Sequence, residues 1–265
     1  MTEIAPEWLG SAGKSSQLIV ALDVPTVADA RTLVARLGAS VGFYKVGMWL
    51  LFEPDGGRLI DELVASGNQV FLDYKMYDIP ETVRRGVASV ARSGARIVTV
   101  HGDPEIVAAA ADGAQGTSLL VFAVSVLTSQ NDASLAAMGY RQTVAELVAL
   151  RVRAAAAAGA HGVIASAADD PDALRAQAGA PLLVATPGIR LPGAAPDDQK
   201  RVATPEQAVA RGADYLVVGR PITQAPDPAA AAQEVLASME RGAHMRERSE
   251  NSNRVQHRHT PRIGD

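Results

Sequence analysis

The sequence contains no cysteine among its 265 residues, which excludes disulfide bonds and thiolate chemistry. This absence fits a reducing compartment, and we expect a cytoplasmic protein. No stretch is apolar for long enough to cross a membrane, and the N-terminal region lacks the basic and then apolar segments of a secretory signal. The net charge of -4 gives no indication of a nucleic-acid partner. We therefore expect neither a membrane nor a nucleic acid among the partners of this protein.

What the sequence does contain is typical of a globular protein with a sizeable core, since hydrophobic residues make up 48% and charged residues 20%. The length suits a single catalytic domain, which we place at residues 17–240. Residues 1–16 are polar and contain glycine, and they predict a flexible lead-in. Residues 241–265 hold few apolar side chains and many arginines and histidines. We expect a disordered tail there, and an origin in an expression vector would also fit its composition.

Short apolar runs alternate with segments of helical composition along the whole of this domain. The runs predict strands at residues 17–23, 43–46, 69–72, 96–101, 118–126, 162–165, 181–185 and 214–218. The segments that follow them predict helices at residues 27–37, 57–65, 81–93, 104–111, 144–158, 171–177, 204–211 and 228–240. Each predicted strand is thus followed by a helix.

This alternation indicates an α/β fold. Strands that are so apolar and so regularly separated by helices need a parallel sheet covered on its outer side. Eight repeats of the unit favour a closed (β/α)8 TIM barrel, whose working residues lie at the carboxyl ends of the strands. An open doubly wound sheet is the second choice, but no G-x-G-x-x-G follows the first strand to support it.

The stretch LDYKMYDIP, residues 72–80, places three charges, Asp73, Lys75 and Asp78, directly after the third apolar run. Side chains two apart on a strand share a face, so Asp73 and Lys75 project the same way. Asp78 lies in the following loop, because Pro80 excludes a continuing central strand. An ordinary surface ion pair is the alternative interpretation. The apolar flank argues against it, since unneeded charge at the boundary of a core is costly.

Polar residues end several of the other predicted strands as well. In a closed barrel the carboxyl ends of the strands meet around one opening, so these side chains should gather there. The residues at or just after strand ends are Asp23, Lys45, Asp73, Lys75, His101 and Thr128.

Two loops with glycine and arginine follow the last two strands: TPGIR, with Gly188 and Arg190, and VGRP, with Gly219 and Arg220. Loops in these places are the usual phosphate site of such barrels. Glycine lets backbone N–H groups approach the phosphate oxygens, and arginine adds charge-assisted bonds. For either loop alone, glycines that only turn the chain and solvated arginines would explain the residues equally well. The two loops together favour a phosphate site.

These motifs together resemble the orotidine 5′-phosphate decarboxylase family, particularly its bacterial branch. The resemblance extends from about Leu18 to Met239, and the matching pieces occur in order: ALDVP, FYKVG, LDYKMYDIPET, VTVHG, SVLTS, TPGIRLPGAAPDDQKR and YLVVGRPIT. The chain departs from the residues more usual in the family at Tyr74, Met76, Tyr77 and Glu81. None of these departures alters the charged residues of the motif.

The resemblance implies that the protein converts orotidine 5′-phosphate (OMP) to UMP and carbon dioxide in pyrimidine biosynthesis. It implies that no cofactor and no metal takes part. Lys75 would be the catalytic lysine, and it would stand in a charged row with Lys45, Asp73 and Asp78.

The resemblance also implies a homodimer, in which Asp78, Ile79 and Thr82 complete the active site of the partner subunit. The substrate would be held by Asp23 and Lys45 at the ribose, by Thr128 at the pyrimidine, and by Arg190, Gln199, Gly219 and Arg220 at the phosphate.

The charges suit this reaction. Decarboxylation without a cofactor leaves a carbanion on the pyrimidine ring, which an ammonium group can stabilise and then protonate. Carboxylates on both sides of Lys75 favour its ammonium form, which argues against a Schiff-base role. Asp73 would hold Lys75 in place, and its charge beside the substrate carboxylate would also raise the energy of the bound ground state.

Two alternatives remain open at this stage. Sugar-phosphate decarboxylases and hexulose-phosphate synthases resemble the D-x-K-x-x-D motif, but they bind magnesium and usually continue with a small residue and glycine, where this chain has Ile79 and Pro80. Chelator sensitivity would discriminate them. A non-catalytic nucleotide-binding barrel would need a broken charged row, and every member of the row is present.

Overall fold

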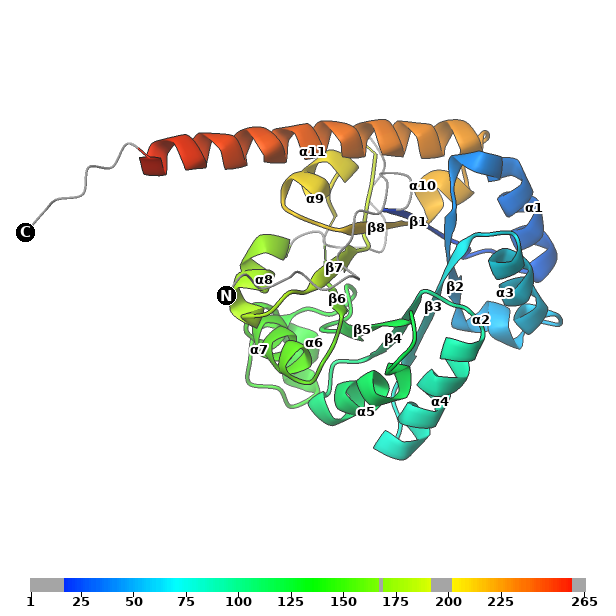
Figure 1. The fold of residues 1–265 in the computed structure, drawn as a ribbon, viewed down its shortest axis with the longest axis horizontal. Helices are drawn as coiled ribbons and strands as arrows, with labels where there is room; N and C mark the ends of the chain where they lie inside the picture. Colours follow the sequence, from blue (N-terminus) through cyan, green and yellow to red (C-terminus); the bar gives the residue numbers. More distant parts are fainter. Residues whose placement is uncertain (1–16, 167–168, 192–201, 259–265) are drawn as a thin grey trace, which may run out of the picture.

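The protein is a closed barrel of eight parallel strands, seen in a computed structural model that describes residues 17–166, 169–191 and 202–258 (Figure 1). Each strand pairs with the next in sequence, and β8 pairs with β1. The strands are β1 (Leu18–Ala21), β2 (Phe43–Gly47), β3 (Gln69–Met76), β4 (Ile97–His101), β5 (Leu120–Val124), β6 (Gly162–Ile164), β7 (Leu183–Thr186) and β8 (Tyr215–Val218). The predicted (β/α)8 TIM barrel is confirmed. The expected lead-in, residues 1–16, lies outside the described residues.

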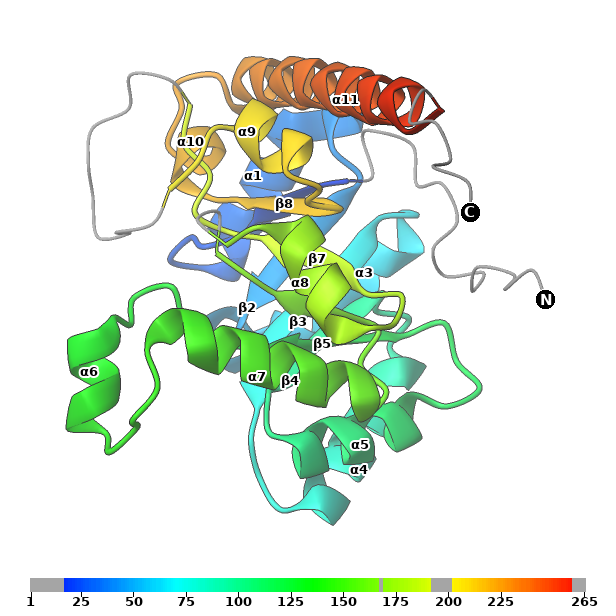
Figure 2. The same cartoon turned by 90° about the vertical axis from the view of Figure 1, so that its left-hand side faces the viewer.

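Helices surround the barrel on its outer side (Figures 1 and 2). The helices that the sequence predicts are α1 (Val27–Leu37), α3 (Gly56–Ala65), α4 (Pro80–Arg92), α5 (Pro104–Ala114), α7 (Val144–Ala157), α8 (Pro171–Ala178), α9 (Pro205–Ala210) and α11 (Pro228–Arg258). Short helices that it does not predict are η3 (Gly38–Ser40), α2 (Met48–Phe52), α6 (Asp132–Ala137) and α10 (Arg220–Thr223). None of the helices in the described part of the chain is long and apolar enough to span a membrane.

Side-chain caps fix where several helices begin. Thr26 accepts a hydrogen bond from the backbone N–H of Asp29, whose carboxylate bonds back to the N–H of Thr26. Thr143 and Thr204 form the same reciprocal box at the starts of α7 and α9. Each box satisfies backbone donors that a helix start leaves free, so the strand-to-helix turns are defined locally.

Alternate residues of each strand face the barrel interior, where aromatic rings fill the centre. The ring of Tyr215 meets Phe43 edge-on at 5.9 Å and Phe122 at 6.1 Å between centroids. The intervening residues face outward and pack against the helices as a second apolar layer. Because the strands are buried on both faces, their sequences are continuous apolar runs.

The inward-facing rows change from apolar to polar toward the carboxyl ends of the strands. Two residues after the buried Phe43 comes Lys45, and two residues after Phe71 comes Asp73. Thr99 takes the corresponding inward position on β4 and is fully buried. The two-residue period of a strand therefore directs these polar groups to the same end of the barrel.

The helix α11 continues past the point where the composition predicts a disordered tail, and that expectation is corrected as far as Arg258. Two ion pairs tie the extension to the barrel's helices. Arg241 Nε lies 3.0 Å from Glu206 Oε2, and Arg246 Nη2 lies 3.0 Å from Asp172 Oδ1. A polar segment without an apolar face can thus remain helical when it continues an anchored helix and contains no proline.

The packed interior predicts a cost for added volume at Gly162 on β6. A Cβ at this position would lie 2.5 Å from the ring of Phe122. We expect Gly162→Ala to lower the free energy of unfolding by about 1–3 kcal/mol, measured by chemical denaturation, because the close-packed core must shift. Gly57→Ala in α3 is the control, because nothing lies within 4 Å of its Cβ position. Equal stabilities for the two variants would contradict this description of the core.

Candidate active site

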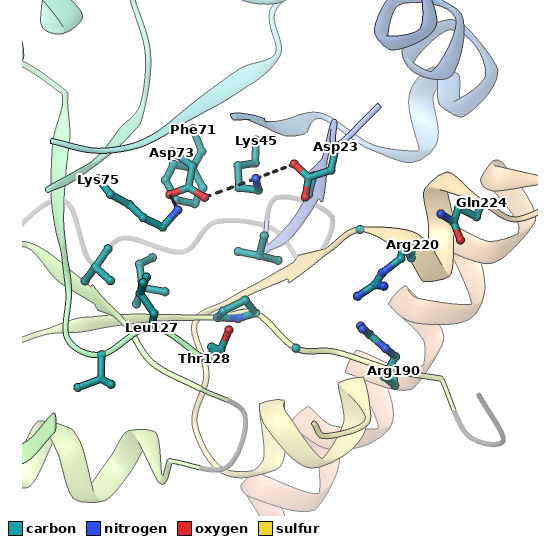
Figure 3. A pocket seen from close by; sticks show the side chains of 18 residues that line it. Asp23, Lys45, Phe71, Asp73, Lys75, Leu127, Thr128, Arg190, Arg220 and Gln224 are labelled. Atoms are coloured by element: carbon teal, nitrogen blue, oxygen red, sulfur yellow. Dashed lines mark hydrogen bonds and ion pairs between the residues drawn. The ribbon is translucent and has the colours of Figure 1, made fainter. Parts of the chain in front are cut away.

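A cavity of about 450 Å³ opens at the carboxyl ends of the strands (Figure 3). The strands and the loops that follow them contribute its polar lining, which consists of Asp23, Lys45, Asp73, Lys75, Thr128, Arg190, Arg220 and Gln224. Apolar residues of the inner layer, including Phe71, Ile164 and Val217, form part of its wall. The cavity is therefore polar around its rim and apolar toward the barrel centre.

Acidic and basic side chains alternate along one wall of this cavity. Lys45 Nζ lies 2.9 Å from Asp23 Oδ1 and 3.4 Å from Asp73 Oδ2. On the other side of the same carboxylate, Lys75 Nζ lies 2.7 Å from Asp73 Oδ1. Of the row that the resemblance implies, Lys45, Asp73 and Lys75 lie together here, with Asp23 beside Lys45 and without Asp78. From here on, we use the name charged row for Asp23, Lys45, Asp73 and Lys75 (Figure 3). Every charge in the row has a neighbour of opposite sign, so the row is stable while facing a cavity.

Burial differs along the charged row. The side chains of Lys45 and Asp73 are 10% and 15% exposed, whereas that of Lys75 is 42% exposed. Burial alone raises the pKa of Asp73, but the charges of Lys45 and Lys75 outweigh it. Hydrogen bonds from Lys75 and Thr99 add to their effect, and the pKa of Asp73 is lowered from its usual value. Asp73 is therefore an anion at neutral pH, and Lys75 is the more exposed of the two lysines in the row.

The backbone of β3 is irregular where it carries these residues. The register between β3 and β4 shifts between Leu72 and Met76. Within this bulge Lys75 has a φ of 48°, in the left-handed region that non-glycine residues seldom adopt. Bulges next to active sites commonly redirect a side chain, and here the redirected side chain is the exposed lysine of the charged row.

Two arginines stand on the segments after β7 and β8, at the end of the cavity away from Lys75 (Figure 3). Figure 3 shows the guanidinium groups of Arg190 and Arg220 turned toward the same space. Gly188 precedes Arg190 with a φ of 83°, a conformation that favours glycine. Gly219 precedes Arg220 and also lines the cavity. The loops thus offer cationic groups together with closely approachable backbone.

The structure places some of the predicted site residues around one cavity and leaves others outside it. Asp78, Ile79 and Thr82 lie at the start of α4, are exposed, and do not line the cavity of their own chain. Asp78 instead accepts a hydrogen bond of 2.6 Å from the N–H of Ile79. Gln199 lies outside the described residues.

His101 does not join the main cavity, contrary to the prediction that it would share one opening with the charged row. It lines an adjacent cavity of about 200 Å³, to which Lys75 also contributes. Its ring packs against Tyr77 at 4.3 Å between centroids. Burial, and then the charge of Arg151, lower the pKa of His101. The uncharged imidazole is therefore the form expected at neutral pH.

Sequence patterns miss two polar residues of this region, Thr99 and Gln224. Thr99 does not line the cavity, but its hydroxyl donates a hydrogen bond of 2.9 Å to Asp73. The sequence signal that could have identified Thr99 is its place in the predicted strand, two residues after Ile97 and therefore on the same face. Gln224 follows the short helix α10 and lines the cavity beside Arg220.

The arrangement suits a ligand with two anionic ends and a largely uncharged middle. Lys75 can meet one anionic group, and the arginine pair can bind a phosphate through charge-assisted bonds. Thr128 lies between them and can hydrogen-bond a polar ring (Figure 3). A carboxylate placed near Lys75 would also approach the Asp73 anion, which favours a reaction that removes that carboxylate.

Comparisons with known proteins agree with this geometry. A family model described as "Orotidine 5'-phosphate decarboxylase / HUMPS family" matches residues 16–235. A Bradyrhizobium sp. (strain BTAi1) protein named orotidine 5′-phosphate decarboxylase is 48% identical over 238 residues, covering 90% of this chain and 94% of that protein. One of the same name from Afipia carboxidovorans is 49% identical over 223 residues, covering 84% and 94%. The crystal structure of orotidine 5′-phosphate decarboxylase from Lactobacillus acidophilus has a TM-score of 0.74 and 34% identity, and covers 84% of this chain and 99% of that chain.

The lowered pKa of Asp73 predicts how its contribution to stability depends on pH. A carboxylate whose folded pKa lies below its usual 3.8 adds stability that is fully present above the unfolded pKa. That stability is lost as the pH falls through the folded pKa. We expect the difference in unfolding free energy between wild type and Asp73→Asn to be constant above about pH 5 and to shrink below about pH 4. Chemical denaturation at several pH values measures it, and a difference that grows on acidification would contradict the assignment.

Proposed function

The chain belongs to the orotidine 5′-phosphate decarboxylase / HUMPS family, and from this premise we propose how its residues carry out the reaction. The protein is a carboxy-lyase that converts OMP to UMP and carbon dioxide in pyrimidine biosynthesis. The observation that carries the mechanism is the position of Lys75, which pairs with Asp73 at 2.7 Å and still faces the cavity. The remaining residues serve to bring the reacting carbon of OMP to that ammonium group.

In the proposed complex OMP lies across the cavity. Its phosphate binds Arg190, Arg220 and the backbone of Gly219, together with Gln199. Asp23 and Lys45 bind the ribose hydroxyls, and Thr128 binds the pyrimidine. The charge and position of the cavity-lining residues support this pose, because Lys75 and the two arginines lie at opposite ends of one cavity (Figure 3). Binding energy from the distant phosphate can then be used to orient the ring.

Decarboxylation breaks the bond between the ring carbon and the carboxylate, and the electron pair stays on the ring carbon. The ammonium of Lys75 stabilises this developing carbanion and then donates a proton to it, forming the C–H bond of UMP. Asp73 holds the ammonium in place, and its negative charge disfavours the substrate carboxylate until carbon dioxide leaves. We assign the larger effect to the holding role, because a preorganised charge needs no reorganisation during the reaction.

We further propose a homodimer in which Asp78, Ile79 and Thr82 reach the cavity of the partner subunit. All three are exposed and lie outside the cavity of their own chain. Apolar side chains also stand exposed in the segments that follow β2 and β3, with Phe52 at 78%, Tyr77 at 64% and Ile79 at 67%. An exposed apolar surface of this kind is typical of a protein–protein interface. Asp78 would then join the charged row on the free side of Lys75.

No cofactor enters the proposed mechanism, because the ammonium of Lys75 supplies both the charge and the proton. We propose a cytoplasmic location, which the cysteine-free sequence and the place of the reaction in pyrimidine biosynthesis support. The sugar-phosphate enzymes that share the D-x-K-x-x-D motif differ in their need for magnesium. Activity in the presence of a chelator therefore separates the two readings.

The reaction is tested most simply by the loss of OMP ultraviolet absorbance in the presence of a chelator. We expect purified wild-type protein to consume OMP and the folded variant Lys75→Ala to show no turnover above background, because the variant lacks the proton donor. Circular dichroism establishes that both proteins are folded. An inactive wild type that gains activity on a sugar phosphate with magnesium would overturn the assignment.

The shared active site makes a separate prediction about subunit mixing. Lys75→Ala and Asp78→Asn should each have little activity as pure dimers. In a mixed dimer, one site combines the intact Lys75 of one chain with the intact Asp78 of the other. We expect random mixing to restore about a quarter of wild-type activity, since half of the dimers are mixed and each has one intact site. Absence of any recovery in mixed dimers would place Asp78 in its own subunit's site, and full activity of pure Asp78→Asn dimers would place it outside the reaction.

A further inference from the structure

The irregular stretch of β3 faces a single residue of β4. The register between the two strands shifts between Leu72 and Met76, and residues 73–75 stand opposite Thr99 alone. In a regular ladder the backbone N–H of Lys75 would bond to a backbone carbonyl of the neighbouring strand. Here it donates instead to the hydroxyl oxygen of Thr99, at 3.0 Å.

The same hydroxyl also bonds to the side-chain partner of Lys75. Thr99 Oγ1 lies 2.9 Å from Asp73 Oδ1, the oxygen that accepts from Lys75 Nζ at 2.7 Å. The amide can only donate and the ionised carboxylate can only accept, so the direction of both bonds is fixed. One hydroxyl thus links the backbone of Lys75 to the carboxylate that holds its ammonium group.

Two features make this link more than an incidental contact. Lys75 has a φ of 48°, and such a conformation persists in a non-glycine residue only where its surroundings hold it. Thr99 is fully buried, so no solvent competes for its hydroxyl in this structure. Without the hydroxyl, the amide of Lys75 would lose this acceptor, and the bulge could relax.

We propose that Thr99 is a positioning residue for decarboxylation. Its hydroxyl fixes the left-handed backbone of Lys75 and the orientation of the Asp73 carboxylate, and so aims the ammonium at the reacting carbon. Thr99 itself does not line the cavity, so the proposed complex has no contact between Thr99 and OMP. The inference rests on the proposed role of Lys75 and extends it to a residue that the substrate does not touch.

The test compares Thr99→Val, which keeps the branched shape and removes the hydroxyl, with Thr99→Ser, which keeps the hydroxyl. We expect Thr99→Val to lower kcat by about 10- to 100-fold, since small misplacements of a reacting group cost that much. The dissociation constant for UMP should change by less than about threefold, because the phosphate and ribose contacts remain. Thr99→Ser should recover most of the lost kcat.

Thr117→Val is the control for the loss of a hydrogen-bonded threonine hydroxyl away from the cavity. The hydroxyl of Thr117 also donates one hydrogen bond and accepts another: it donates to the backbone carbonyl of Ala114 at 2.7 Å and accepts from the N–H of Leu119 at 3.3 Å. It lies before β5, at the end of the barrel opposite the cavity. We expect its loss to leave kcat unchanged, so any general effect of removing such a hydroxyl is measured separately.

A second readout does not depend on activity. The crystal structure of ligand-free Thr99→Val should have Lys75 outside the left-handed region or its ammonium displaced from Asp73. An unchanged kcat in Thr99→Val, or equal losses in the valine and serine variants, would overturn the positioning role. An inactive wild type with the displacement present in Thr99→Val would instead count against the proposed reaction and leave the structural link intact.

Discussion

The structure of the site depends on one carboxylate that two lysines share. Asp73 binds Lys45 through one oxygen and Lys75 through the other, and it is the most deeply placed anion of the cavity. Taking an anion out of water is costly, and two cations together offset that cost where one would not. Lys45 and Thr99 fix the carboxylate of Asp73 from inside the barrel. The ammonium of Lys75, which pairs with this carboxylate, is thereby held at a defined place facing the cavity.

The barrel explains how so many charges come together without weakening the core. Strand alternation puts apolar side chains in the lower interior and polar ones two residues further on, so the same rows serve packing and chemistry. Parallel strands bring these ends to one rim, and the last two loops add the arginine pair at the end of the cavity away from Lys75 (Figure 3). In the proposed complex the phosphate lies at the arginine pair, away from Lys75. Its binding therefore orients the ring without taking part in bond breaking.

The sequence was sufficient for those features that depend on local pattern. The alternation of continuous apolar runs with helical segments predicted the barrel, and the strand ends predicted that Lys45 and Asp73 would meet at one opening. It was not sufficient where the partner is distant in the chain. The left-handed backbone of Lys75 depends on Thr99, which lies on another strand, and D-x-K spacing alone cannot reveal it. His101 likewise ends a strand as expected, yet the bulged β3 and Tyr77 place it in the adjacent cavity.

The short helices and the extension of α11 escaped prediction for a related reason. Short or polar segments carry a weak periodic signal and are held by contacts with other parts of the chain.

A crystal structure with UMP would show whether one ligand spans the charged row and the arginine pair. We expect the pyrimidine against Lys75, the phosphate between Arg190 and Arg220, and Asp78 of the second subunit beside the same lysine. UMP bound with its phosphate away from both arginines, or a site closed without Asp78, would contradict this expectation.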